Sequence, residues 1–232
     1  MKGMQSKEDA IAEILRIYKH IKHEIEARLS EFKRLWAEGS EEDIFAELAF
    51  CILTPQTKAR NCWNAVLRLR DADLLLKGNE KRVAEALEGV RFRHKKAKYI
   101  VEARNFFSNN GQLSIKSALK SAIEAENATL EAESGRNFAR DWLSRHILGF
   151  GYKEASHFLR NIGFGENIAI LDRHILKNLM LLGVIDEIPH SLSKRRYLDI
   201  ERRMRIFASK IGVRMSHLDL VLWYKEVGEV FK

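Results

Sequence analysis

The chain has 232 residues, of which 46% are hydrophobic and 31% charged, a composition typical of a globular protein and unlike that of a disordered one. Its formal net charge of +8 favours a polyanionic partner, because lysines and arginines that neutralise phosphates release counterions. No apolar run approaches the roughly 18 residues that a membrane-spanning helix needs, and the N-terminus lacks the apolar stretch of a secretory signal. We therefore expect no membrane partner and a cytoplasmic location.

Two capping boxes are predicted in the first part of the chain. Ser6 and Asp9 stand at the start of one amphipathic segment, and Ser40 and Asp43 have the same spacing at the start of a second. In such a box the side chains at both positions accept hydrogen bonds from backbone N–H groups of the first turn. Both pairs therefore predict where a helix begins.

The rest of the chain also follows a helical period. Thr54 and Pro55 are expected to be the N-cap and first residue of a third helix, because proline needs no N–H donor there. Further helices are expected near residues 80–88, 94–108, 114–125, 135–148, 152–162, 173–182, 193–211 and 216–230. With two prolines and no persistent strand-like alternation, the predicted fold class is all-α.

Two cysteines, Cys51 and Cys62, are too few for a disulfide scaffold or for a zinc or iron–sulfur site, which usually needs about four protein ligands. We expect two buried thiols. His146, His157 and His174 lack the tight spacing of metal ligands, so no metal site is predicted. Basic side chains gather at residues 93–98, 194–196 and 202–205, where both solvated helix faces and phosphate contacts stay open as interpretations.

The most informative stretch is residues 138–162, in which two amphipathic segments are joined by Leu148-Gly149-Phe150-Gly151. Two glycines spaced by one residue allow a sharp turn and leave the backbone N–H groups unobstructed. The second helix begins at once, so these donors and the helix N-terminus suit a phosphate. With Ala155 four residues after Gly151, the pattern is that of a helix–hairpin–helix, which holds DNA by its backbone; an ordinary tight turn between helices is the alternative.

Lys153 and Asp172 are the candidate chemical groups. Lys153 falls in the first turn of a helix, where its charge opposes the helix dipole, and a neutral amine there is a nucleophile. Asp172 follows the apolar run Ile168–Leu171 and precedes a new helical period, which predicts an N-cap carboxylate. Taken singly, each residue also fits a purely structural role: Lys153 as a surface lysine and Asp172 as a helix cap.

Together with the hairpin, the two residues resemble the helix–hairpin–helix DNA glycosylase superfamily. The core of the resemblance covers about residues 138–182. No cysteine follows Cys62, unlike the iron–sulfur branch, and no strand signal suggests an extra β domain. The chain is most similar to the small archaeal and bacterial 8-oxoguanine DNA glycosylase/AP lyases, and the segments 53–59 and 218–224 extend the resemblance over most of the chain from about residue 40.

The resemblance implies two helical lobes, with the active site in the cleft between them. We expect residues 1–60 and 190–232 in one lobe and residues 61–189 in the other. In the implied reaction, DNA is bound, the damaged nucleotide is flipped out, and Lys153 attacks its C1′. Asp172 would stabilise the positive charge on the sugar, and assistance with proton transfer stays open as a second role. A Schiff base then forms, and β-elimination nicks the strand.

The resemblance also names a base pocket. Trp223 would stack on the flipped base, Asp219 would accept hydrogen bonds from its Watson–Crick edge, and Lys232 would recognise the oxidised base. Gln56 would fill the gap in the duplex or line the pocket, while Gly149, Phe150 and Gly151 hold the DNA backbone.

No cofactor is required by the implied reaction, and a monovalent cation held by the hairpin carbonyls would be structural. The expected partner is double-stranded DNA containing an oxidised base, bound by a monomer at the nucleoid. Three alternatives stay open at this stage: a non-catalytic helix–hairpin–helix DNA-binding protein, a bifunctional glycosylase for another oxidised base, and a helical interaction protein.

Overall fold

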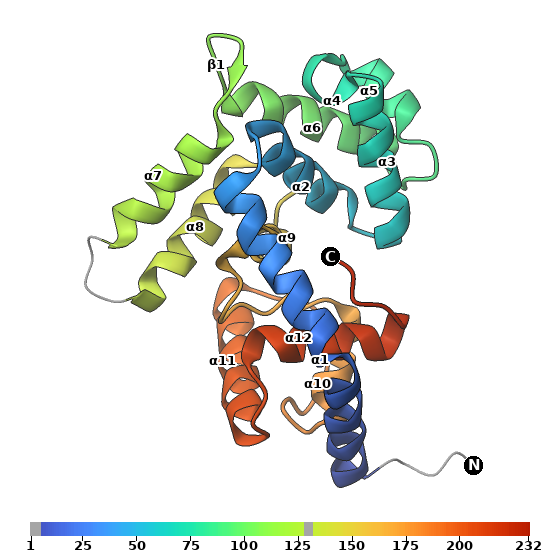
Figure 1. Cartoon of the computed structure of the whole chain (residues 1–232), viewed down its shortest axis with the longest axis vertical. Coiled ribbons are helices and arrows are strands. Elements are labelled where there is room, and N and C mark those ends of the chain that lie inside the picture. Colours follow the sequence, from blue (N-terminus) through green and yellow to red (C-terminus); the bar gives the residue numbers. More distant parts are fainter. Residues whose placement is uncertain (1–5, 128–131) are drawn as a thin grey trace. The chain divides into compact units, whose positions relative to one another are not determined.

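A computed structural model describes residues 6–127 and 132–232 of the chain; residues 1–5 and 128–131 lie outside the description (Figure 1). The fold is all-α, as predicted. Its helices are α1 (Lys7–Glu38), α2 (Glu41–Leu53), α3 (Ala59–Asp71), α4 (Leu74–Lys77), α5 (Glu80–Ala86), α6 (Arg93–Phe107), α7 (Ile115–Asn127), α8 (Ala132–His146), α9 (Tyr152–Leu159), the π-helical turn η1 (Arg160–Phe164), α10 (Arg173–Leu181), α11 (Lys194–Lys210) and α12 (Met215–Val227).

A two-residue antiparallel hairpin separates α6 from α7. Its strands are β1 (Ser108–Asn109) and β2 (Gln112–Leu113), with Ser108 opposite Leu113. Among the described residues, no helix is long and apolar enough to cross a membrane.

The chain divides into two compact units, and the boundaries differ from those expected. Unit 1 contains residues 1–33 and 165–232, and unit 2 contains residues 34–164. We expected the divisions after residues 60 and 189. The first division lies inside α1, so one continuous helix contributes residues to both units.

Helix α2 explains why the first expected boundary was wrong. All ten residues from Ile44 to Leu53 are buried, and nine of them are apolar or small, as in a helix that lies at the centre of a core. Their neighbours are α3, α6, α7 and α9, so α2 is the central helix of unit 2. A segment surrounded on all sides by unit 2 cannot belong to the other unit.

In unit 1, α12 contacts both α10 and α11. The first part of α1 is tied to α12 by the Tyr18 hydroxyl, 3.2 Å from Nδ1 of His217, and by a 2.9 Å ion pair between Lys225 and Glu13. The packing of α10 on α12 places residues 165–189 in unit 1, which corrects the second expected boundary.

The predicted capping box at Ser40 is confirmed, and the pair at Ser6 forms one of its two expected hydrogen bonds. The Ser6 hydroxyl accepts a hydrogen bond from the Asp9 N–H at 3.1 Å, and the Ser40 hydroxyl accepts one from the Asp43 N–H at 3.2 Å. The Asp43 carboxylate also accepts from the Ser40 N–H at 2.9 Å, which completes the reciprocal pair. These side chains satisfy backbone donors that the first helical turn leaves without partners.

The predicted N-cap at Thr54 is wrong. Thr54 is the C-cap of α2, and its hydroxyl donates to the carbonyl of Cys51 at 2.9 Å. The next helix begins only at Ala59, and residues 54–58 form a turn between the two helices. Proline fits this turn as well as a helix start, because its fixed φ suits both.

Candidate active site

The hairpin joins α8 to α9 through residues 147–151, as the glycine spacing predicted. Gly149 has a φ of +85°, a conformation that side chains with a Cβ rarely adopt. A Cβ there would lie 2.5 Å from Cδ2 of Tyr99 on α6, so the Tyr99 ring packs directly against the backbone of Gly149. Gly151 has an ordinary extended conformation, with φ −96°. The turn therefore requires the first glycine much more strictly than the second.

Two N–H groups of the hairpin, those of Phe150 and Gly151, are engaged inside the protein, contrary to expectation. The Phe150 N–H donates to the Ile147 carbonyl at 3.1 Å, and the Gly151 N–H donates to the Glu154 carboxylate at 3.0 Å. The Phe150 side chain is buried beside Phe158. The donors that a helix start leaves without an intrahelical partner are instead those of the first turn of α9, residues 152–154.

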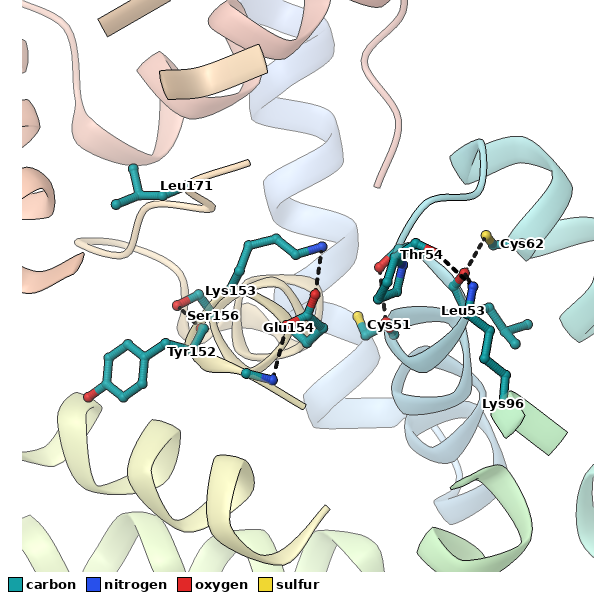
Figure 2. Close-up of polar contacts among 12 residues, drawn as sticks. Cys51, Leu53, Thr54, Cys62, Lys96, Tyr152, Lys153, Glu154, Ser156 and Leu171 are labelled. Atoms are coloured by element: carbon teal, nitrogen blue, oxygen red, sulfur yellow. Dashed lines mark hydrogen bonds and ion pairs between the residues drawn. The ribbon is translucent and has the colours of Figure 1, made fainter. Parts of the chain in front are cut away.

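Lys153 is the second residue of α9, and its side chain is only 23% exposed. Its Nζ lies 2.9 Å from Oε1 of Glu154, the next residue in the sequence, whose side chain is 12% exposed. Figure 2 shows the two side chains meeting at the start of the helix. The expected conflict between a lysine charge and the helix dipole is thus offset by an adjacent carboxylate.

The charge of Lys153 affects the pKa values of titratable groups on neighbouring helices. Burial raises the pKa of the Cys62 thiol to about 11, and the positive charges of Lys96 and Lys153 oppose that rise. Burial also raises the pKa of Cys51 well above its usual value. Both cysteines are free and buried, as predicted, and these pKa values make them poor nucleophiles at neutral pH.

Lys96 of α6 is a buried cation that sequence analysis did not single out. Its Nζ donates to the carbonyl of Leu53 at 2.7 Å (Figure 2). It also donates to the carbonyl of Pro55 at 2.7 Å and to the Thr57 hydroxyl at 3.2 Å. These three acceptors define the turn that carries Gln56, whose φ is +58°. The predicted DNA-contacting Gln56 therefore sits on a turn held from inside by one ammonium group.

Asp172 is the N-cap of α10, as predicted, and its Oδ1 accepts a hydrogen bond from the Ile175 N–H at 2.8 Å. The apolar segment before it is held by side chains of α11 and α12. Glu201 accepts from the Ala169 N–H at 2.8 Å, and Asp219 accepts from the Ile170 N–H at 3.0 Å.

Tyr197 completes this set of contacts. Its hydroxyl donates to the Ala169 carbonyl at 2.6 Å and accepts from the Leu171 N–H at 3.2 Å. Three consecutive N–H groups, those of residues 169–171, thus end on buried side chains of two helices. The backbone leading to Asp172 is fixed without a neighbouring strand.

The other predicted pocket residues lie on or after α12, in unit 1. Trp223 packs edge-on against His174 with ring centroids 5.8 Å apart, and its buried indole N–H has no hydrogen-bond partner among the described residues. Asp219 is buried and holds the Ile170 N–H, so that one of its oxygens serves the backbone. Lys232 lies beyond the helix and is half-buried. Their contacts with a base stay predictions.

The three basic clusters have different fates. In the first, Arg93, Lys95 and Lys98 are exposed while Lys96 is buried. Residues 194–196 are exposed. In the third, Arg202 and Arg203 both pair with Asp199 at 2.9 Å, which leaves less of their charge for an outside partner.

The predicted residues are divided between the two units. Lys153 and Gln56 belong to unit 2, and Asp172, Asp219, Trp223 and Lys232 belong to unit 1. Glu154 was missed although its position three residues after Gly151 is the acidic position of a capping box. Across the described residues, no group of three or more potential ligands is arranged to hold a metal ion.

Comparison with protein families gives a match over most of the chain. Residues 25–213 match the family model described as 8-oxoguanine DNA glycosylase. An 8-oxoguanine DNA glycosylase/AP lyase of Fusobacterium nucleatum is 45% identical over 226 residues, covering 97% of this chain and 99% of the relative. The corresponding protein of Methanocaldococcus jannaschii is 41% identical over 213 residues, covering 91% and 93%.

Solved structures give the same answer. The 8-oxoguanine DNA glycosylase of Thermotoga maritima has a TM-score of 0.81 and 36% identity, covering 97% of this chain and all of that chain. The M. jannaschii 8-oxoguanine glycosylase/lyase in complex with a 15mer DNA containing 8-oxoguanine also has a TM-score of 0.81, with 39% identity and coverage of 96% and 99%.

Proposed function

The chain belongs to the 8-oxoguanine DNA glycosylase family, and we propose that Lys153 and Asp172 are its catalytic pair. The protein is a bifunctional base-excision repair enzyme, which removes 8-oxoguanine from duplex DNA and cleaves the strand as an AP lyase. The observation that carries the assignment of Lys153 is its position, two residues after the hairpin and partly buried at the start of α9.

Lys153 supplies the nucleophile. Its neutral amine attacks C1′ of the flipped nucleotide, the bond from C1′ to the base breaks, and the sugar opens to a Schiff base with Nζ. Loss of a proton from C2′ then expels the 3′ phosphate by β-elimination. Hydrolysis of the Schiff base releases Lys153 for the next cycle.

Asp172 supplies negative charge. Positive charge develops on the sugar as the base leaves, and a carboxylate fixed in place stabilises that charge without reorganising during the step. The hydrogen bond from the Ile175 N–H fixes Oδ1, and the contacts of residues 169–171 fix the backbone before it. Catalysis by this pair requires Lys153 and Asp172 to act on the same flipped nucleotide.

The same proposal covers base recognition. Trp223 stacks on the flipped base, with Lys232 and Asp219 contacting its edge, and Gln56 fills the gap that the base leaves in the duplex. The unpartnered indole N–H of Trp223 supports a role in binding, because buried donors without partners are rare. The DNA backbone is held by the first-turn N–H groups of α9, next to Gly149, Phe150 and Gly151.

The reaction proposed for this chain requires no cofactor, and a monovalent cation at the hairpin carbonyls would be structural. The enzyme works on double-stranded DNA as a monomer, at the nucleoid within the cytoplasm. Its substrate supports this location, since chromosomal DNA is found there.

Borohydride trapping on a duplex with 8-oxoguanine opposite cytosine tests the catalytic pair. The wild-type protein should give a covalent DNA adduct, and Lys153→Gln should give none. Asp172→Asn should slow base release by about 100-fold or more, since the charge is lost. Asparagine is chosen because it also caps helices, so α10 should keep its start.

The matched control is Lys77→Gln, which removes an exposed lysine of unit 2 that pairs only locally with Asp73. It should trap like the wild-type protein. A parallel duplex with thymine glycol measures lesion preference, and we expect slower cleavage there. An adduct of full yield with Lys153→Gln would overturn the assignment of the nucleophile.

A further inference from the structure

Glu154 makes two contacts that involve different parts of the proposed site. Its Oε1 lies 2.9 Å from Nζ of Lys153, and its Oε2 accepts the hydrogen bond from the Gly151 N–H at 3.0 Å. The carboxylate thus joins the hairpin backbone to the nucleophilic amine. Each oxygen has its own partner, so the carboxylate cannot rotate away without losing a hydrogen bond.

We propose that Glu154 is the base that receives the proton of Lys153 before the amine attacks C1′. This inference rests on the proposed role of Lys153 as the nucleophile. In this step the Nζ–H bond of the ammonium breaks, an O–H bond forms on Oε1 of Glu154, and the electron pair remains on Nζ. The protonated carboxyl group then carries the proton that a later step of the same reaction returns.

The geometry meets the requirement for direct proton transfer. A base must lie within about 2.6–3.2 Å of the atom that loses the proton, and the 2.9 Å ion pair is within that range. Because Glu154 follows Lys153 directly in the first turn of α9, the pair is held by the helix itself. The hydrogen bond from Gly151 keeps the carboxylate oriented towards the start of the helix.

Titratable and charged groups of the packed helices surround the pair. They are Cys51 and Glu47 on α2, Cys62 on α3, Lys96 on α6 and Arg160 on η1. Burial raises the pKa of both thiols, so they stay protonated near neutral pH and have no free site for the proton of Lys153. The Glu154 carboxylate lies 2.9 Å from Nζ of Lys153 and can accept this proton directly.

Transfer within the pair predicts a distinctive pH profile. The route through Glu154 starts from the ion pair and neither takes up nor releases a proton, so its rate is independent of pH near neutrality. Without the carboxylate, the proton must leave to solvent. The rate should then rise about tenfold for each pH unit until the amine is fully deprotonated.

Glu154→Gln tests this directly, because the glutamine oxygen can still accept the Gly151 hydrogen bond although its amide nitrogen cannot accept a proton. The substrate is a duplex with a preformed abasic site, and the measurement is the rate of cyanoborohydride trapping from pH 6 to 8. We expect a flat profile for the wild-type protein. The variant should be about 100-fold slower at pH 7 and become faster with pH.

Asp43→Asn is the matched control, since Asp43 is the acidic member of the capping box of α2 and contacts Ser40 and Arg70. Loss of its charge should leave the pH profile of trapping flat. Melting temperature and affinity for the abasic duplex, measured for both variants, register any loss of helix capping. A purely capping role of Glu154 would change these values and leave the profile flat.

The outcomes separate the two proposals. Failure of the wild-type protein to trap would overturn the role of Lys153, and the role of Glu154 with it. Wild-type trapping together with an equal or faster rate for Glu154→Gln at pH 7 would overturn the role of Glu154 alone. In that case the ion pair restrains the amine rather than activating it.

Discussion

Lys96 keeps its ammonium group where water barely reaches, with the residue 4% exposed and three oxygen acceptors from the turn after α2 around Nζ. Burial, together with the nearby charges of Lys153 and Arg91, lowers the pKa of this amine to about 8 against the opposing effect of Cys62. The turn that presents Gln56 is therefore bound to a group that titrates only slightly above neutral pH.

This pKa predicts how stability changes with pH. In the unfolded chain the amine titrates near 10.5, so between pH 8 and 10.5 the unfolded state holds more protons than the folded one. Stability contributed through Lys96 therefore rises with pH in that window. Urea denaturation at pH 7.5, 8.5 and 9.5 should show this rise in the wild-type protein relative to Lys96→Met.

The control is Lys95→Met, because Lys95 is the exposed neighbour of Lys96 on the same helix. Its stability should follow the wild-type pH dependence. Other groups, the two cysteines included, also titrate at alkaline pH, so the informative quantity is the difference between each variant and the wild-type protein. An identical pH dependence in Lys96→Met would mean that the amine titrates normally in the folded chain.

Sequence alone revealed Lys153 and concealed Lys96. Lys153 stands out because the glycines before it fix its place in a helix start. Lys96 lies in a run of basic residues, and its exposed neighbours Lys95 and Lys98 are lysines as well, so residue type does not distinguish them. Burial of one lysine in such a run depends on the carbonyls of a distant turn, which no local pattern records.

The helix–hairpin–helix depends on a single left-handed residue. Gly149→Ala places a Cβ at a φ of +85° and within 2.5 Å of the Tyr99 ring, so both backbone strain and overlap destabilise the variant. We expect a loss of about 3 kcal/mol in the free energy of unfolding, measured by urea denaturation. The loss should be accompanied by weaker DNA binding.

Gly151→Ala is the paired comparison within the same motif. Its φ of −96° suits any residue, and the added Cβ would lie 3.1 Å from the flexible Glu154 carboxylate. We expect a loss below about 1 kcal/mol. Equal losses for the two variants would show that the contact with Tyr99 adapts and that the positive φ costs little.

Helix starts were predicted better than helix ends. The boxes at Ser40 and at Ser6 were identified because their side-chain contacts are local in sequence. Thr54-Pro55 was misassigned because a threonine before a proline fits both the N-cap of a new helix and the C-cap of the previous one. Lys96, which binds the carbonyl end of α2, decides between the two, and it lies about forty residues further along the chain.

The net charge of the enzyme determines how its affinity for DNA depends on salt. With +8 on the chain and exposed basic side chains at residues 93–95, 98 and 194–196, binding should include phosphate contacts and weaken with salt. For about four contacts, log affinity should fall with a slope of about −3.6 against log salt, or about 100-fold from 50 to 200 mM. Fluorescence anisotropy with an undamaged duplex measures the slope.

A triple variant, Arg93→Gln with Lys95→Gln and Lys98→Gln, should make this slope shallower. Arg202→Gln should change it less, because Arg202 already pairs with Asp199. A slope near zero for the wild-type protein would mean that the positive charge does not contact phosphates.

The division into two units could be predicted from the sequence, but the residues at which the units meet could not. The resemblance implied that the N-terminal and C-terminal segments fold together. The boundaries depend on packing. Helix α2 is buried in the core of unit 2, and α10 packs on α12 and therefore belongs to unit 1. Hydrophobic runs indicate burial, and they do not identify the neighbours that bury them.

The segment Ile168–Leu171 has a consequence for solubility. Four apolar residues in a non-helical stretch resemble a strand that can pair with a second chain and seed aggregation. Here Tyr197, Glu201 and Asp219 occupy the N–H groups that an incoming strand would need. The side chains that fix the backbone before Asp172 therefore also prevent a second chain from pairing with this segment as a β-strand.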